Sequence, residues 1–80
     1  MHHEGIIEVY YMCGETEKAN ALLTEYFDIL NQRMVYFNSL KPKIRATVEQ
    51  DQYETMAQLE ELRMLLGKFG QNDKLLELGF

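Results

Sequence analysis

Very little in this 80-residue sequence could cross-link the chain or interrupt a helix, because it holds one cysteine and one proline. Since Cys13 is alone, no disulfide can form within the chain, and the fold must hold without one. A single proline among many Leu, Glu, Lys, Gln and Met residues favours helices. Eighty residues suffice for one small domain, which we expect to span residues 1–80, as a fragment of a larger protein.

Positive charge is also scarce. Eight Lys and Arg residues stand against thirteen Asp and Glu residues, for a net charge of −5. This balance argues against nucleic-acid binding and against docking on anionic lipid. No apolar run is long enough to span a bilayer or to form a secretory signal, so we expect no direct membrane insertion. Residues 1–4, short and polar, are interpreted as a remnant of an expression tag and are left out of the fold prediction.

The first apolar segment covers residues 5–13. Its Ile, Val and Tyr residues would suit a strand, but the chain offers no second β-like segment to pair with. Ile7 and Tyr11 lie one helical turn apart, and Glu8 falls on the other side, so we predict a helix. Gly14 suits the left-handed position that ends such a helix.

The next segment predicts a long helix over residues 16–39. The short link at Gly14 makes this helix an antiparallel neighbour of the first. The turn-forming residues that end at Pro42 stop it. Its apolar stripe recurs at three- and four-residue steps: Ala19, Leu22, Leu23, Tyr26, Phe27, Leu30, Met34 and Phe37.

Residues 41–50 read as a connection, with Ile44 and Val48 expected to pack against the bundle. Asp51 and Glu54 have the spacing of a capping box and predict the start of a third helix, which Gly70 ends. Its main stripe comprises Met56, Leu59, Leu62, Leu66 and Phe69, and a second, narrower face carries Tyr53, Ala57 and Met64. A short C-terminal helix follows, capped by Asn72 or Asp73 and anchored by Leu75, Leu76 and Leu78.

No catalytic, cofactor or metal site is predicted. His2, His3, Glu8 and Cys13 are of metal-ligand types, but His3 and Cys13 lie nearly three helical turns apart and cannot meet at one ion. Cys13 has no histidine nearby to act as a base, and we interpret it as a small core or boundary residue. The pairs Glu60–Glu61 and Glu25–Asp28 fall on polar helix faces, where solvated charge is expected. We therefore expect no enzyme activity.

Aromatic residues are more numerous than a three-helix core of this size hides, and some are expected at a contact surface. Tyr11, Tyr36 and Tyr53 fall off the main stripes and are the candidates. The apolar run of residues 34–37 wraps around its helix, so Val35 and Tyr36 should stay partly exposed. A second copy in a two-fold arrangement is the expected partner in the isolated chain.

Two resemblances sharpen this interpretation. An aromatic in the first helix, a glycine turn, a small residue and a large apolar residue resemble a tetratricopeptide repeat: Tyr10, Gly14, Ala19 and Leu23. The small residue lets the two helices approach closely. The sequence departs from the repeat at His3, Ile7, Tyr26 and Asn31.

The longer order "IIEVYYMCGETEKANALLTEYFDILNQRMVYFNSLKP" and "QLEELRMLLGKFGQ" is similar to the C-terminal helical region of large bacterial multi-spanning membrane proteins. These proteins resemble protein O-mannosyltransferases in their N-terminal part. The resemblance covers about residues 6–76. It implies a soluble part of an inner-membrane protein, on the periplasmic side, with the transferase-like site elsewhere.

The sequence thus predicts an all-α fold: a tetratricopeptide-like hairpin, a third helix and a short C-terminal helix. The expected function is a non-catalytic protein–protein interaction module, bound to a protein partner or to preceding helical repeats. The alternatives are a structural end-cap of a helical repeat array and a small homodimeric helical protein without a ligand.

Overall fold

The computed structural model describes residues 3–80, with the backbone alone for His3, and Met1 and His2 lie outside the described residues. This part of the chain contains no strand, which confirms the all-α prediction. Its helices are α1 (His3–Met12), α2 (Thr16–Ser39), α3 (Pro42–Arg45), the 3₁₀ helix η1 (Ala46–Val48), α4 (Glu49–Lys68) and α5 (Asn72–Leu78).

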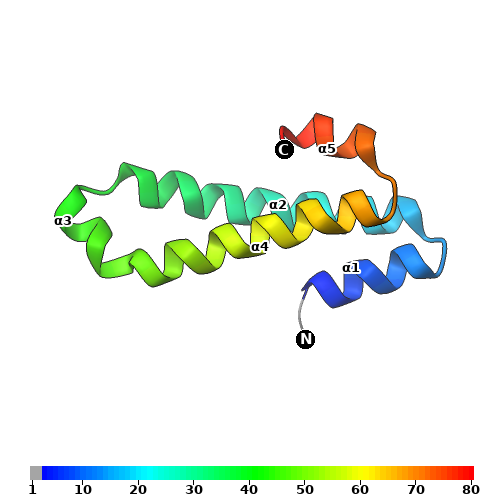
Figure 1. Cartoon of the computed structure of the whole chain (residues 1–80), viewed down its shortest axis with the longest axis horizontal. Helices are drawn as coiled ribbons and strands as arrows, with labels where there is room; N and C mark the ends of the chain where they lie inside the picture. Colours follow the sequence, from blue (N-terminus) through cyan, green and yellow to red (C-terminus); the bar gives the residue numbers. More distant parts are fainter. Residues whose placement is uncertain (1–2) are drawn as a thin grey trace.

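The long helices α2 and α4 run side by side as an antiparallel hairpin, joined at one end by α3 and η1 (Figure 1). At the other end α1 packs against both α2 and α4, and α5 packs on α4. The molecule is accordingly elongated, at 46 × 27 × 17 Å. We name the flanked half, residues 3–30 and 59–80, the base, and the bare half, residues 31–58, the tip.

The α1–α2 turn has the geometry that the glycine predicted. Gly14 adopts φ 79°, and its N–H donates to the carbonyl oxygen of Tyr11 at 3.1 Å. The next N–H, that of Glu15, donates to the carbonyl oxygen of Tyr10 at 2.8 Å. Together these bonds form a Schellman motif, which satisfies carbonyl groups that the helix end would otherwise leave unpaired. The same motif ends α4 at Gly70, with φ 68°.

One hydrophobic cluster, placed entirely in the base, forms the core of the molecule. Its buried members are Ile7 and Tyr11 from α1; Ala19, Leu23, Tyr26 and Leu30 from α2; and Leu62, Leu65 and Leu66 from α4. Ala19 is fully buried in this cluster, as expected of a small residue where two helices lie close. Half-buried residues that include Leu75 and Leu78 of α5 pack against the cluster.

The segment before α4 was predicted wrongly. Residues 42–48 are helical rather than an open connection, and α4 begins at Glu49 with Val48 at its N-cap, so Asp51 lies inside the first turn. No capping box forms, because Asp51 has no role at the cap. Arg45 holds the segment instead: its guanidinium donates to the carbonyl oxygens of Phe37, Asn38 and Leu40 at 2.9–3.2 Å. These carbonyl groups lie at the end of α2, where helical partners run out, although the Phe37 carbonyl oxygen also accepts the Leu40 N–H at 3.2 Å.

Several burial predictions were also wrong. Ile44, Met56, Leu76 and Cys13 are exposed, although each was expected to be buried or at a boundary. On α4 the buried stripe runs through Thr55, Leu62, Leu65 and Leu66, so Thr55 and Leu65 take places that sequence reasoning had not given them. At the chain ends, Gln71 stands at the N-cap of α5 in place of Asn72 or Asp73, and His3 and Glu4 belong to α1.

Candidate interaction surface

The tip carries a group of exposed apolar and aromatic side chains. Val35, Tyr36 and Tyr53 are 64%, 59% and 60% exposed, and Ile44 and Met56 are about half exposed. The exposure of Val35 and Tyr36 confirms what the four-residue apolar run predicted. The base also exposes large apolar side chains, but the tip differs in that two of its five are tyrosines, which are favoured at surfaces that another molecule covers. We refer to these five residues as the tip patch.

The tip is bare because its neighbours are too short to reach it. Ten-residue α1 and seven-residue α5 lie beside the base, while the 24 residues of α2 and 20 residues of α4 continue past them (Figure 1). In the tip, Phe37 and Thr55 are the buried residues. The Thr55 hydroxyl donates to the carbonyl oxygen of Asp51 at 2.9 Å, so its burial leaves no polar group unpaired.

Between α2 and α4 the tip is hollowed by a shallow depression of about 370 Å³. Arg33 lies on its α2 wall, and Asp51 and Glu54 lie on its α4 wall. Tyr36 also borders it and joins it to the tip patch. The depression therefore offers both signs of charge beside apolar surface, as interface rims often do.

Tyr11 does not belong to this surface, although the sequence suggested it. It is 7% exposed and stacks on Phe69 with 4.9 Å between ring centroids. Its hydroxyl donates to Asn20 Oδ1, and Asn20 Nδ2 donates in turn to Gln71 Oε1 at 3.3 Å. Burial raises the pKa of the Tyr11 hydroxyl. The residue thus ties α1 to α2 and to the α4–α5 turn, which is a structural task.

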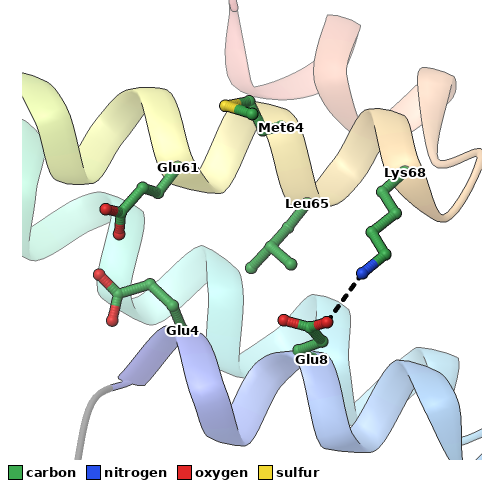
Figure 2. Close-up of a pocket in the computed structure, with 6 residues that line it drawn as sticks. All are labelled: Glu4, Glu8, Glu61, Met64, Leu65 and Lys68. Atoms are coloured by element: carbon green, nitrogen blue, oxygen red, sulfur yellow. Dashed lines mark hydrogen bonds and ion pairs between the residues drawn. The ribbon is translucent and has the colours of Figure 1, made fainter.

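A second feature lies at the base, in a groove between α1 and α4 of about 340 Å³ (Figure 2). Glu4 and Glu8 line it from α1, and Glu61 lines it from α4. Leu65 projects between the two helices, and Met64 borders the groove at its outer edge. We refer to it as the base groove.

One ion pair closes an end of the base groove. Lys68 Nζ donates to Glu8 Oε1 at 2.8 Å and lies 5.4 Å from the centre of the Phe69 ring. At the other end Glu4 and Glu61 extend from facing helices toward the same opening (Figure 2). The pKa of Tyr26 is raised first by burial and then by the charge of Glu4, whereas the charge of Arg33 lowers it and that of Glu61 raises it.

The acidic pair Glu60–Glu61 proves to be divided between two environments. Glu60 points to solvent and binds Arg63, whose guanidinium holds the pKa of this carboxyl below its usual range. Glu61 faces the base groove instead. Two carboxylates that face apart cannot share a proton-transfer task on one substrate.

Among the described side chains, His, Cys, Asp and Glu residues form no group of three or more that could hold a metal ion. Within residues 3–80, no helix combines the length and apolar character needed to cross a membrane. The side chains of His2 and His3 lie outside the described residues.

Sequence reasoning did not assign several residues to these surfaces. Ile44 and Met56 were assigned to the core, although they belong to the tip patch. Met64 was placed on the second face of its helix, a signal that could have identified it as exposed. Comparison with protein-family models, with curated proteins and with solved structures gave no match for this chain.

Proposed function

We propose that this chain is a non-catalytic helical module for protein–protein interaction, and that its binding surface is the tip patch. The observation that carries the proposal is the exposure of Val35, Tyr36 and Tyr53 on the half of the hairpin that no other helix covers. Tyrosine is favoured in binding surfaces because it presents a large, rigid area with few rotatable bonds.

The tip has the physical properties of an interface rather than of a core. The five side chains of the tip patch are exposed, so the fold gains little from them, and they would contribute mainly when another surface removes them from water. Arg33, Asp51 and Glu54 around the neighbouring depression supply polar groups for orientation. Because area alone does not set affinity, the two exposed tyrosines of the tip, Tyr36 and Tyr53, should provide most of the binding energy.

The order of the helices supports a place among helical repeats. The α1–α2 and α4–α5 pairs are joined by the same kind of three-residue turn, with Glu15 at φ −87°, ψ 58° and Gln71 at φ −88°, ψ 54°. Helix α4 packs on both members of the first pair. Helix pairs that stack on their neighbours in this way cannot bury every apolar face alone. We extend the proposal to the resemblance: the module belongs to the periplasmic part of a glycosyltransferase-like membrane protein.

The first test uses a second copy of the chain as the binding partner and measures self-association. We expect amide-resolved NMR spectra, recorded from dilute to concentrated protein, to show shifts at Val35, Tyr36 and Tyr53. The Tyr36→Ser/Tyr53→Ser variant should lose these shifts. Its free energy of unfolding should change by no more than about 0.5 kcal/mol per substitution, because both side chains are exposed.

Tyr10→Ser provides the matched control, since Tyr10 is half buried against the core. It should lower stability without removing the concentration-dependent shifts of the tip. Tip signals that stay fixed at every concentration would contradict the proposed function. So would a Tyr36→Ser/Tyr53→Ser variant that associates as strongly as the unaltered chain.

A further inference from the structure

The depression in the tip lies on the face of the hairpin that α1 covers in the base. Glu54 and Gln58, which line the depression, precede Glu61 and Leu65 of the base groove by seven residues each. Seven residues are close to two helical turns, so both pairs lie on one side of α4. Helix α1 lines the groove, but it contributes no described residue to the depression. The tip therefore continues the surface on which a helix packs, and residues 3–80 leave this part of it uncovered.

The outer side of α4 carries side chains that could fill such a depression. Tyr53 lies two residues from buried Thr55, so the two side chains leave α4 on nearly opposite sides. Met56 lies one turn after Tyr53, and these two side chains are 49% and 60% exposed. Glu49 lies one turn before Tyr53 and lines the same shallow hollow. We refer to Glu49, Tyr53 and Met56 as the α4 ridge.

The charges of the tip are divided between its two long helices. Residues 31–45, from α2 and α3, contain no Asp or Glu and four basic residues: Arg33, Lys41, Lys43 and Arg45. Residues 46–58, from η1 and the start of α4, contain no Lys or Arg and three acidic residues: Glu49, Asp51 and Glu54. A two-fold contact that places the α2 side of each copy on the α4 side of the other joins opposite charges twice.

We propose that two copies of the chain form a two-fold pair in which the α4 ridge of each copy lies in the tip depression of the other. Tyr53 then packs against Tyr36, and Glu49 lies near Arg33 on the α2 wall. This inference rests on the proposed function of the tip and names the partner as the α4 ridge of a second copy. Each copy supplies one ridge and one depression, so the pair is closed and adds no third chain.

The residues on the α2 wall are suited to this contact. The Tyr36 ring lies 5.8 Å from the ring of buried Phe37, which orients it, and it remains 59% exposed. Arg33 and Glu49 are both exposed. The ion pairs within residues 3–80 involve neither of them: Lys18–Glu15, Arg63–Glu60, Lys68–Glu8 and Lys74–Glu77. Both charges can therefore pair with a second copy without breaking an ion pair of the folded chain.

Charge reversal tests the pairing by sedimentation equilibrium. Arg33→Glu and Glu49→Arg each place two pairs of like charges in the contact, and each variant alone should associate about tenfold more weakly than the unaltered chain. Arg33→Glu/Glu49→Arg in one chain restores both pairs with their signs exchanged, so its association should lie within about threefold of the unaltered chain. Both positions are exposed, so the variants should stay folded, which circular dichroism checks.

A mixture of the two single variants provides an independent test. In a mixed pair both contacts join opposite charges, so its affinity should be close to that of the unaltered pair. A fluorescent label on the exposed Cys13 of Arg33→Glu follows these mixed pairs from the base. Glu25→Arg is the matched control, because Glu25 is exposed on α2 in the base and the variant has the same net charge as Glu49→Arg. It should associate normally alone, and its mixed pairs with Arg33→Glu should stay weaker than the unaltered pair.

Three results would overturn this inference: normal association of either single variant, no recovery in Arg33→Glu/Glu49→Arg, and a particle of more than two chains. The Tyr36→Ser/Tyr53→Ser variant then separates the two claims. If it fails to associate, the proposed function stands and the tip binds in another arrangement. If it associates normally, the proposed function is contradicted as well.

Discussion

The base and the tip are built from the same two helices, yet they bury very different fractions of their apolar side chains. In the base, Leu23, Leu30 and Leu62 are completely removed from water. In the tip, Val35 and Tyr36 of α2 remain more than half exposed, as does Tyr53 of α4. The difference comes from the neighbours: α1 and α5 flank the base and stop before the tip.

This contrast shows what an apolar stripe on a helix predicts. The stripe of α2 continues from Ala19 to Phe37, and both ends of it are buried. Residues beside the buried positions of this stripe become core only where a third helix covers them. Leu22 packs against the core, whereas Ile29 and Tyr36, spaced at seven and fourteen residues from it, are exposed. Periodicity thus predicts which face of α2 packs against its first neighbouring helix. The number of further neighbouring helices determines which other positions of α2 are buried.

The largest expected effect separates the two halves directly. Leu62→Ala should lower the free energy of unfolding by about 2–5 kcal/mol, because it opens a cavity in the core. Val35→Ala, which removes apolar atoms from the tip, should change stability by no more than about 0.5 kcal/mol. Urea unfolding of dilute protein measures both. Equal losses would mean that the tip contributes to the core as much as the base does.

Overpacking should give the next largest effect. Ala19 is fully buried where α1 and α2 pack, so Ala19→Leu should cost about 1–3 kcal/mol. Ala57 is an exposed alanine on α4 in the tip, and Ala57→Leu is the control for which little change is expected. An unchanged denaturation midpoint for Ala19→Leu would show that α1 does not pack closely here.

Substitutions at Gly14 test how much the α1–α2 turn contributes to the stability of the fold. A Cβ at this position would meet no atom within 4 Å, so a substitution is opposed by the backbone conformation alone. Gly14→Val should cost about 1–2 kcal/mol at φ 79°, and Gly14→Asn should cost less, because asparagine tolerates left-handed conformations. Thermal unfolding of both variants checks this ranking, which equal stabilities would contradict.

Loss of one hydrogen bond at the base should give the smallest effect. Tyr11→Phe removes the donor to Asn20 and should cost about 0.5–1.5 kcal/mol at neutral pH. Burial raises the pKa of the Tyr11 and Tyr26 hydroxyls, so the folded state keeps these protons to higher pH than the unfolded state. Their contribution is complete below the ordinary tyrosine value near 10 and is lost as pH rises through the folded pKa.

The free energy of unfolding of the unaltered chain and of Tyr11→Phe should therefore be measured as the pH is raised. Stability of the unaltered chain should fall above about pH 10, and Tyr11→Phe should make the fall shallower, since one of the two buried hydroxyls is gone. An identical slope in the two proteins would show that Tyr11 is not shielded from water.

Local signals in the sequence predicted most of the fold. The bounds of α2, the positive φ of Gly14 and the burial of Leu62 and Leu66 follow from periodicity and turn chemistry. The long-range contacts of Tyr11 do not, because Phe69 and the Asn20–Gln71 pair come together only in the folded chain. The sequence identified Val35, Tyr36 and Tyr53 as surface candidates and missed Ile44, which it assigned to a covered connection.

The start of α4 was missed for a similar reason. Asp51 and Glu54 match a local capping pattern, but the chain before them is already helical because Arg45 binds the carbonyl end of α2. The contact of Arg45 with the end of α2 therefore determined where α4 begins, and the local capping pattern did not. The base groove was likewise invisible in the sequence, since Glu4 and Glu61 come from helices far apart in the chain.

Native-state hydrogen exchange at two protein concentrations is the most direct test of the central claim. The claim is that the base stabilises the folded chain and that the tip becomes protected only when another molecule binds it. In dilute protein, amides around Leu23 and Leu62 should exchange only through global unfolding, and those around Val35 and Tyr53 should exchange through smaller openings. In concentrated protein the tip amides should gain protection, and the amides around Leu23 should not. Tip amides as protected as the base in dilute protein, and unchanged on concentration, would contradict this account.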